Sequence, residues 1–345
     1  MSFPTVFVFF LSCAVQCSLP ASSTTTSNTR RRLASRKPPL SLYNLKSREL
    51  AARLKSSVSV VEAAEDGDVH ELFDHYNCEH VYIDMGTNVG VQIRKIHEPQ
   101  KYPNALALPV FQKYFGPGPR CNVCTIGFEP NPSHSRRLDI LQRRYRASGA
   151  GVLIFNAAVG TQTGILEYGT HSKKADENDD WAGSVVSATN TYTGQQLFRS
   201  VRSVDVARII KLADARLRQK FGGKRLNSKI VAKSDVESSE FTVFPHLVMT
   251  KAICALDFVF IEWHTGHFDP VVHGRKQTQY FEPNRRGVVE AHDFVLNVVH
   301  QLNKMFAQGR NETETCATEF SEIDDETYRR DGLPWPTQPF CKTVS

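Results

Sequence analysis

Three groups of polar residues stand where short apolar runs of the chain end. The first is Asp84–Gly90, which reads Asp-Met-Gly-Thr-Asn-Val-Gly at the end of the run Val81–Met85. Its glycines, Gly86 and Gly90, permit a tight turn, and a helix that begins here would offer free N–H groups to an anionic ligand group. The spacing G-x-x-x-G differs from the dinucleotide and phosphate-loop patterns, and the preceding carboxylate suits a cationic group such as an amino-acid ammonium. The alternative is a tight turn without a ligand.

The second is a single acid, Glu129, in the sequence Gly-Phe-Glu-Pro-Asn-Pro at the end of the run Cys121–Phe128. In nucleoside-binding α/β folds an acid at the tip of the second strand accepts hydrogen bonds from ribose hydroxyls, about 20 residues after the first loop. Here 45 residues separate Asp84 from Glu129, and the insertion 97–120 supplies the excess. Alone, Glu129 would be interpreted as an exposed loop acid. Together with the Asp84–Gly90 loop it predicts a nucleoside cofactor.

The third group is a set of acids and one histidine that follow two further apolar runs. Such groups could accept a proton from a hydroxyl, orient that hydroxyl, or bind a divalent cation. The alternative is a helix N-terminal turn, where acids are common because they favour the helix dipole; we favour this for Glu240 and leave it open for Glu237. The candidate catalytic residues are Asp235, Glu237, Glu262 and His264.

Three histidines, His264, His267 and His273, have the spacing H-x2-H-x5-H, which zinc could use. No cysteine lies near them in the sequence, so we interpret them as loop histidines and predict no metal ligands. His264 is the exception, because it follows a strand tip directly and is a candidate base or acceptor-binding group. A divalent cation held by Asp235 and Glu237 is the alternative to this metal-free site.

The elements that must position these groups alternate between strands and helices. Such alternation predicts βαβ units, and hence a parallel sheet that is buried on both faces. A helix-like stretch at 287–306 follows, and the segments 97–120 and 170–200 are long insertions of the kind that are functional or mobile. The expected strands lie in Val81–Met85, Cys121–Phe128, Gly151–Asn156, Lys229–Ala232, Leu256–Trp263 and Cys316–Ile323, and the expected helices in Arg48–Tyr76, Ser133–Ala147, Val204–Phe221 and Phe241–Ile253.

Five segments of the chain follow one another in an order that is typical of one family: YIDMGTNVG (82–90), GFEPNP (127–132), FNAAVGTQTG (155–164), AKSDVESSEF (232–241) and FIEWH (260–264). Together they resemble the FkbM-type S-adenosylmethionine-dependent methyltransferases. The resemblance covers roughly residues 78–265 and implies an α/β, Class I methyltransferase (Rossmann-like) fold. This fold is a three-layer sandwich with a seven-stranded, mostly parallel sheet whose last strand is antiparallel. It further implies S-adenosylmethionine as the cofactor and methyl transfer to a hydroxyl oxygen.

The resemblance also implies roles for individual residues. Glu129 would face the ribose and the turn Asn156–Ala158, with Asn156 and Ala157, would lie along the adenine. Where the family has Asp-Val-Glu-Gly, this chain has Ser238 in the last position, and Ser234 replaces an apolar residue. These departures concern the acceptor side and motivate the alternative of a catalytically inactive, methyltransferase-like lumenal binding module. The residues expected to face the methionine part are Asp84, Gly86, Asn88 and Gly90.

Composition excludes several classes of protein. Of 345 residues, 41% are hydrophobic and 23% charged, which is typical of globular proteins and excludes collagen-like, coiled-coil and wholly disordered chains. No run of about 18 apolar residues occurs past the N-terminus, which excludes a polytopic membrane protein. The net charge is +6, but residues 30–37 carry five positive charges and leave +1 elsewhere. This near-neutral body argues against nucleic-acid binding, and the expected partner is a small-molecule or glycan acceptor.

The N-terminal residues predict targeting to the secretory pathway. Residues 1–21 are typical of a signal peptide, although the apolar run 3–19 could instead be a short membrane anchor. The basic, Pro-containing segment 22–48 is typical of a disordered linker, and we expect one domain at 49–345. Cleavage would leave six cysteines, an even number that suits an oxidising compartment and permits 15 pairings. Asn311 is the only glycosylation sequon. We expect a secreted or lumenal glycoprotein, with a glycan or secreted metabolite as acceptor; the sequence does not predict its oligomeric state.

Overall fold

The computed structural model divides into two compact units, residues 1–51 and 52–345. No helix among the described residues is long and apolar enough to cross a membrane. The part of the chain that the structure describes does not include the predicted signal peptide, its anchor alternative or the sequon at Asn311. The described residues are 40–170, 183, 197–225, 227–264, 297–298, 301, 316–323, 325, 327–328, 331–336 and 339–341.

The first helix begins earlier than the sequence predicts. Helix α1 spans Leu40–His75, so residues 40–48 of the expected linker are helical. Pro38 and Pro39 come just before its first residue, and proline is compatible with the start of a helix but not with its interior. The residues that follow are rich in Leu, Lys, Arg and Glu, which have high helix propensity. Composition therefore favours a helix directly after the prolines, and the expected linker ends before residue 40 and not at residue 48.

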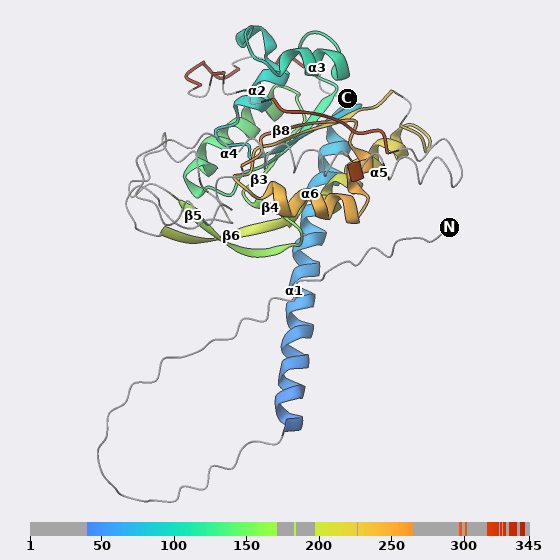
Figure 1. The fold of residues 1–345 in the computed structure, drawn as a ribbon. Coiled ribbons are helices and arrows are strands. Elements are labelled where there is room, and N and C mark those ends of the chain that lie inside the picture. Colours follow the sequence, from blue (N-terminus) through green and yellow to red (C-terminus); the bar gives the residue numbers. More distant parts are fainter. Residues whose placement is uncertain are drawn as a thin grey trace, which may run out of the picture. The chain divides into compact units, whose positions relative to one another are not determined.

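The central sheet contains six described strands, all of which pair in parallel (Figure 1). Their order across the sheet is β3-β2-β1-β7-β8-β9, so all six strands expected from the apolar runs are confirmed. The last of them, β9, closes one edge parallel to β8; an antiparallel seventh strand is not among the described residues. The bounds are β1 His80–Met85, β2 Val123–Phe128, β3 Val152–Phe155, β7 Ile230–Ser234, β8 Phe258–Ile261 and β9 Glu319–Ser321.

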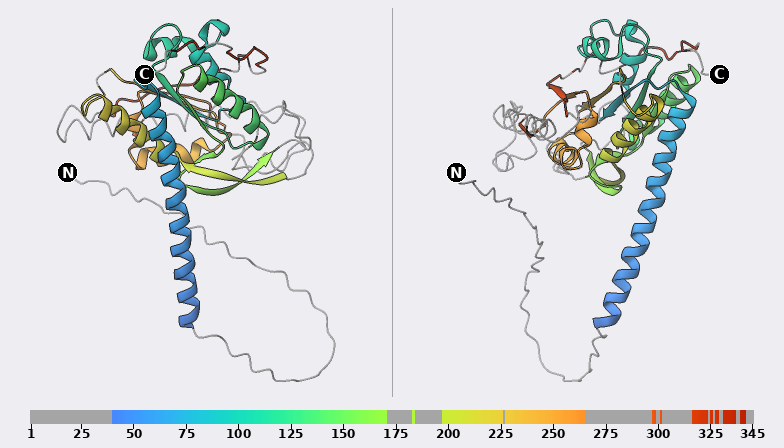
Figure 2. Two further views of the ribbon diagram at one scale, coloured as in Figure 1. Left: turned by 180° about the vertical axis from the view of Figure 1, so that it is seen from behind. Right: turned by 90° about the vertical axis from the view of Figure 1, so that its right-hand side faces the viewer.

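Helices cover both faces of this sheet (Figures 1 and 2). Along β1, Val81, Ile83 and Met85 pack into one core and Tyr82 into the other, because successive side chains of a strand point to opposite faces. The first core is shared with α1, α5 and α6, and the opposite face is covered by α2, α3 and α4. The bounds are α2 Val91–His97, α3 Leu108–Phe115, α4 Pro132–Ala147, α5 Val206–Lys220 and α6 Glu240–Met249.

Two features depart from the sequence-based expectation. The insertion 97–120 is not a long loop: it forms the 3-10 turn η1 (Pro99–Lys101) and α3, whose Phe111 and Phe115 are buried. A second sheet of three strands in the order β4-β6-β5 was not predicted. It consists of β4 Ala158–Gly160, β5 Gly164–Thr170 and β6 Leu197–Asp205, and β6 occupies the end of the expected 170–200 insertion. A short 3-10 turn, η2 (Ala252–Ala255), precedes β8.

Three disulfides pair all six cysteines past the expected signal peptide. They are Cys78–Cys124, Cys121–Cys341 and Cys254–Cys316. The two cysteines of the Cys121-x-x-Cys124 motif thus belong to different bridges, which excludes a CxxC redox pair in this structure. Cys316 and Cys341 each join the C-terminal segment to the body of the domain.

Candidate functional site

The candidate site lies where the sheet order reverses. In β3-β2-β1-β7, the strands β1 and β7 are neighbours in space but not in sequence, and their following helices, α2 and α6, lie on opposite faces. Open α/β sheets bind ligands at such a switch point, outside the carboxyl ends of the strands. The loops after β1, β2 and β7 carry Asn88, Glu129 and Asp235, and all three residues line one pocket there. The strand order thus brings the three predicted groups to one place.

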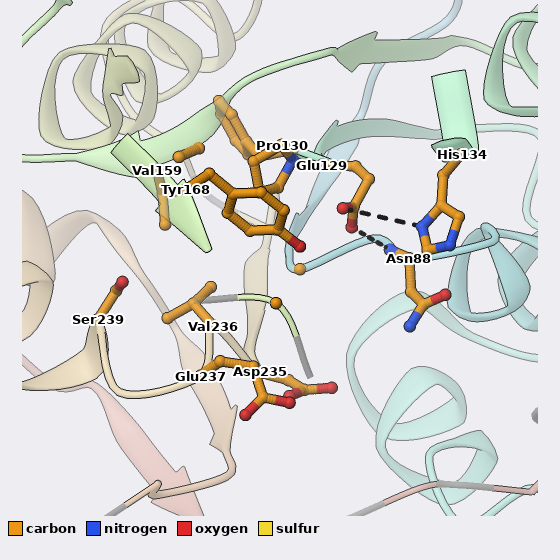
Figure 3. A pocket seen from close by; sticks show the side chains of 14 residues that line it. Asn88, Glu129, Pro130, His134, Val159, Tyr168, Asp235, Val236, Glu237 and Ser239 are labelled. Carbon is orange, nitrogen blue, oxygen red and sulfur yellow. Dashed lines mark hydrogen bonds and ion pairs between the residues drawn. The ribbon is translucent and has the colours of Figure 1, made fainter. Parts of the chain in front are cut away.

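Glu129 ties two of these loops together. Its Oε2 accepts a hydrogen bond from the backbone N–H of Asn88 at 2.7 Å, and its Oε1 accepts one from the N–H of Asn131 at 2.8 Å. In Figure 3 the Glu129 carboxylate and Asn88 lie on one side of the pocket, and Asp235 and Glu237 lie on the other. The Glu129 side chain is nevertheless only 6% exposed. Burial raises its pKa to about 7, although the two backbone N–H groups oppose this shift.

Two further polar atoms at the pocket have no hydrogen-bond partner among the described residues. They are Asn88 Oδ1 and His134 Nδ1, both buried. His134 Nδ1 lies 3.8 Å from Glu129 Oε1, and burial, with the nearby charge of Arg137, lowers the pKa of His134 to about 4. The ring is therefore neutral at physiological pH. Buried polar groups are normally satisfied, so these atoms indicate a pocket built for a polar ligand.

The other walls are largely apolar. Phe128, Val159 and Val236 line the pocket with the ring of Tyr168, and Figure 3 shows Tyr168 between the Glu129 side and the Asp235 side. Apolar and aromatic walls with a few fixed polar groups are typical of sites that bind small molecules or cofactors. The pocket could thus hold a flat apolar group beside the polar groups of Asn88 and Glu129.

A second cluster surrounds His264, after β8. Its Nδ1 lies 3.1 Å from Oε1 of Glu240, which is fully buried. Its Nε2 faces Glu262 Oε1 at 3.3 Å, and Asp235 Oδ1 and Glu237 Oε2 at 3.7 Å each. The four predicted catalytic residues therefore meet around one imidazole, and the fifth member, Glu240, is the acid that the sequence assigned to a helix turn.

The charges of this cluster affect the protonation of its members. Burial disfavours the charged form of His264, but hydrogen bonds to Glu240 and Glu262 and the charge of Glu237 outweigh it and raise the pKa to about 12. His264 without a bound cation is therefore an imidazolium at neutral pH. An imidazolium has no lone pair for a proton, so the carboxylates Asp235 and Glu237 are the better bases.

Several residues predicted to bind the cofactor do not line the pocket. Asp84 is fully buried beneath it; its Oδ1 accepts a hydrogen bond from the Tyr82 hydroxyl, and burial raises its pKa to about 6. Gly90 is the N-cap residue directly before α2, and a Cβ there would meet the Leu141 side chain of α4. Asn156 is exposed and Ala157 is part of the core, while the next residues, Ala158 and Val159, line the pocket instead.

Gly86 lines the pocket, but the backbone at this position requires a glycine whether or not a ligand binds. Its φ is +84°, and a Cβ would lie 1.8 Å from the backbone oxygen of Asp235. The loops after β1 and β7 are in direct contact there, since the N–H of Asp235 also donates to the carbonyl of Met85 at 3.0 Å. Lys233 strengthens this junction: its Nζ donates to Asp235 Oδ2 at 2.8 Å and to the carbonyl of Gly86 at 3.4 Å.

The sequence analysis missed His134 and Tyr168. His134 had a detectable signal, because it follows Asn131-Pro132 and falls in the first turn of α4, directly after the loop of Glu129. Tyr168 had none, since β5 belongs to a sheet that was not predicted. Trp181 and Ser184, in the insertion 170–200, lie outside the described residues; Gly183, between them in the sequence, lines the pocket.

Comparison with known proteins gives no further guide: no protein-family model, no curated protein and no solved structure matches the chain. The similarity to the FkbM-type methyltransferases therefore depends on the five sequence segments. The function must be inferred from those segments together with the geometry of the pocket and of the His264 cluster.

Proposed function

We propose that this chain is an S-adenosylmethionine-dependent O-methyltransferase of the Class I, FkbM-like type. The observation that carries the proposal is the meeting of Asn88, Glu129 and Asp235 in one pocket at the switch point of the sheet. This arrangement would place a nucleoside site beside a proton acceptor, as methyl transfer to a hydroxyl requires. In a Class I enzyme a seventh, antiparallel strand would complete the sheet.

The residues of the pocket fit the proposed cofactor. Glu129 would accept hydrogen bonds from the ribose hydroxyls, and Val159, Phe128 and Tyr168 offer an apolar surface for the adenine. Asn88 Oδ1, buried and without a partner among the described residues, would accept a hydrogen bond from a polar group of the ligand. Asp84, beneath the loop, would act through its charge, because it does not reach the pocket.

The chain itself has two tasks in the reaction. A bound sulfonium supplies a methyl group that is already activated toward a nucleophile. The protein must therefore align an acceptor hydroxyl and remove its proton. Asp235 is the proposed proton acceptor, with Lys233 holding its other oxygen at 2.8 Å. Glu237 and Glu262 would orient the acceptor, and His264 would fix these carboxylates in place.

The three disulfides support a secretory location for this activity. Six paired cysteines are stable in the secretory lumen or outside the cell and are rare in the cytosol. We accordingly propose a glycan or a secreted metabolite as the acceptor, and a signal peptide in residues 1–21, with a short anchor as its alternative.

Calorimetric titration with S-adenosylhomocysteine tests the cofactor site. Glu129→Ala removes charge-assisted hydrogen bonds of about 1.5–3 kcal/mol, so we expect affinity to fall roughly ten- to a hundredfold. Glu167→Ala, which changes an exposed acid of β5, is the matched control and should bind normally. Equal affinity in wild type and both variants would contradict the assignment.

Mass spectrometry after incubation with S-adenosylmethionine and a panel of glycans tests the reaction. A mass increase of one methyl group on an acceptor is the expected result. Binding of the cofactor without transfer to any acceptor would instead favour the inactive binding module.

A further inference from the structure

We propose that Asp235, Glu237 and His264 form a binding site for a first-row divalent transition-metal ion such as Mn²⁺. One ligand atom from each of these residues lies within 4.8 Å of the other two. The two carboxylates follow β7 and the imidazole follows β8, so neighbouring strands bring the three groups together. The proposed methyl transfer does not require such a site. The sequence offered a cation on Asp235 and Glu237 only as an alternative, without His264 as a ligand.

The spacing of the three groups suits a shared ion better than direct contact. Asp235 Oδ1 and Glu237 Oε2 each lie 3.7 Å from the same atom, His264 Nε2, which is too long for a hydrogen bond. Ligands at about 2.0–2.2 Å from a metal ion lie roughly 3–3.5 Å from one another. A small closure of these side chains would therefore give a metal-binding geometry. Glu262 Oε1, at 3.3 Å from the same nitrogen, could supply a further ligand.

The environment of His264 independently resembles that of a metal-binding histidine. Such a histidine usually donates its second ring N–H to a carboxylate, which fixes the ring and aims the other nitrogen at the ion. Here Nδ1 is 3.1 Å from Oε1 of Glu240, whose side chain is fully buried on α6. The second oxygen of Glu240, Oε2, is buried and has no hydrogen-bond partner among the described residues, so a cation nearby would interact favourably with it.

The two loops that carry the ligands are fixed to one another. Glu240 Oε1 also accepts a hydrogen bond from the backbone N–H of Val236 at 2.9 Å, between the two carboxylate ligands. Ser238 Oγ donates to the carbonyl oxygen of His264 at 2.6 Å. The backbone that carries Asp235, Glu237 and His264 is thus held in place before any ion binds, so only the side chains need to close, which lowers the cost of assembling the site.

The donor set indicates which ions to expect. Carboxylates suit Mg²⁺, Ca²⁺ and Mn²⁺, whereas an imidazole nitrogen favours first-row transition metals. A site with both should prefer Mn²⁺ or Zn²⁺ to Mg²⁺ and Ca²⁺. Because Asp235 and Glu237 also line the pocket, an ion here could bind the acceptor hydroxyl and ease the loss of its proton.

Titration of the chelator-treated full chain with Mn²⁺, followed by calorimetry and by loss of the free-ion EPR signal, tests the site. We expect one saturable site per chain, with affinity at least tenfold lower in Asp235→Asn, Glu237→Gln and His264→Ala. The matched controls are Asp139→Asn and His75→Ala, which change exposed residues of α4 and α1 and should bind as wild type does. Excess Mg²⁺ should not displace the Mn²⁺.

A measurement on the wild type alone makes the test independent of how the variants fold. Pulsed EPR of the Mn²⁺-loaded wild type should show coupling to one imidazole nitrogen. As a supplement, Glu240→Gln should perturb this coupling and His264→Ala should abolish it. Weak binding without nitrogen coupling, or binding that Ca²⁺ competes with equally, would overturn the proposal and leave His264 as an imidazolium between carboxylates. S-adenosylhomocysteine is titrated separately without metal, so failure of the ion site and failure of the proposed function are distinguishable.

Discussion

At the scale of single residues, the raised pKa of Glu129 makes a prediction about ligand binding. Its carboxyl has a pKa of about 7, caused by burial. Ribose hydroxyls donate to the ionised carboxylate, so a proton bound below pH 7 must leave when the ligand binds. We therefore expect affinity for S-adenosylhomocysteine to be constant above about pH 7.5 and to fall up to tenfold per pH unit below pH 7.

Titrations between pH 5.5 and 8.5 measure this dependence. Glu129→Gln is the control: it cannot ionise and should lose most of the pH dependence. Asp84, whose burial raises its pKa to about 6, also titrates in this range and should account for what remains. A wild-type affinity that does not change between pH 5.5 and 8.5 would show that Glu129 does not bind the ligand as a carboxylate.

Ser238 stands where the family that the chain resembles has glycine, and its conformation makes a prediction about stability. Its φ is +80°, a left-handed conformation that glycine adopts without strain, and its buried hydroxyl donates to the carbonyl of His264 at 2.6 Å. Ser238→Ala keeps the strain and loses the hydrogen bond, so we expect a loss of about 1–2 kcal/mol in the free energy of unfolding. Ser238→Gly also loses the bond but relieves the strain, and should cost less.

Urea denaturation of the two variants measures the difference. A larger loss for Ser238→Gly than for Ser238→Ala would show that backbone strain at this position is negligible. In either case the structure explains why serine is compatible with the loop that carries Asp235 and Glu237.

At the scale of elements, α2 is a buried helix with charged residues. Arg94 is fully buried, forms ion pairs with Asp331 and with Glu98, and donates to the carbonyls of Leu333 and Pro334 in the C-terminal segment. Removing one partner of a buried ion pair costs about 3–5 kcal/mol when the other charge is left unpaired. Here Asp331 keeps Arg137 and Glu98 keeps Lys101, so we expect Arg94→Met to lower stability by less than this amount.

The control for Arg94→Met is Arg143→Met, which changes an exposed arginine of α4 and should leave the unfolding midpoint nearly unchanged. Limited proteolysis of the variants locates the effect: in Arg94→Met cleavage should begin in the segment around Asp331. Loss of stability without faster cleavage there would mean that the network supports α2 alone.

The elements also show what sequence patterns could and could not predict. The strands of the central sheet are continuous apolar runs such as Val81–Met85, because helices cover both faces, and these were recognised. β5 has no such run: Ile165 is exposed and Tyr168 is buried by its own small sheet. The helix α3 lies between prolines and glycines that suggested a loop, although Phe111 and Phe115 have helical spacing.

Some residues of the candidate site could be predicted from the sequence, and others could not. Asp235, Glu237 and His264 were predicted from their places after strand ends, because parallel strands bring such residues to one edge. Glu240 was assigned to helix structure, since its contact with His264 joins residues 24 positions apart and no local pattern reports it. Asp84 and Gly90 fit the motif, but no local pattern reports the contact of Asp84 with Tyr82 or the close packing of Gly90 against Leu141 of α4.

At the scale of the whole molecule, the N-terminus and the disulfides make a joint prediction. Cys13 and Cys17 lie in the expected signal peptide, and the six remaining cysteines are paired with one another. A secreted and cleaved chain should therefore begin near Ser18 or Ser22 and contain no free thiol. An uncleaved, anchored chain would retain two additional cysteines.

Counting thiols in the denatured, unreduced protein from a eukaryotic host, together with N-terminal sequencing, distinguishes these cases. We expect no reactive thiol, a glycosidase-sensitive Asn311, and peptide maps that link Cys78 to Cys124, Cys121 to Cys341 and Cys254 to Cys316. Each bridge constrains the unfolded chain and should contribute about 2–4 kcal/mol, so reduction should lower the melting temperature markedly. Reactivity of all the cysteines in the native host's protein would place the chain in a reducing compartment. A lumenal glycan could then no longer be the acceptor, even if the cofactor site were correct.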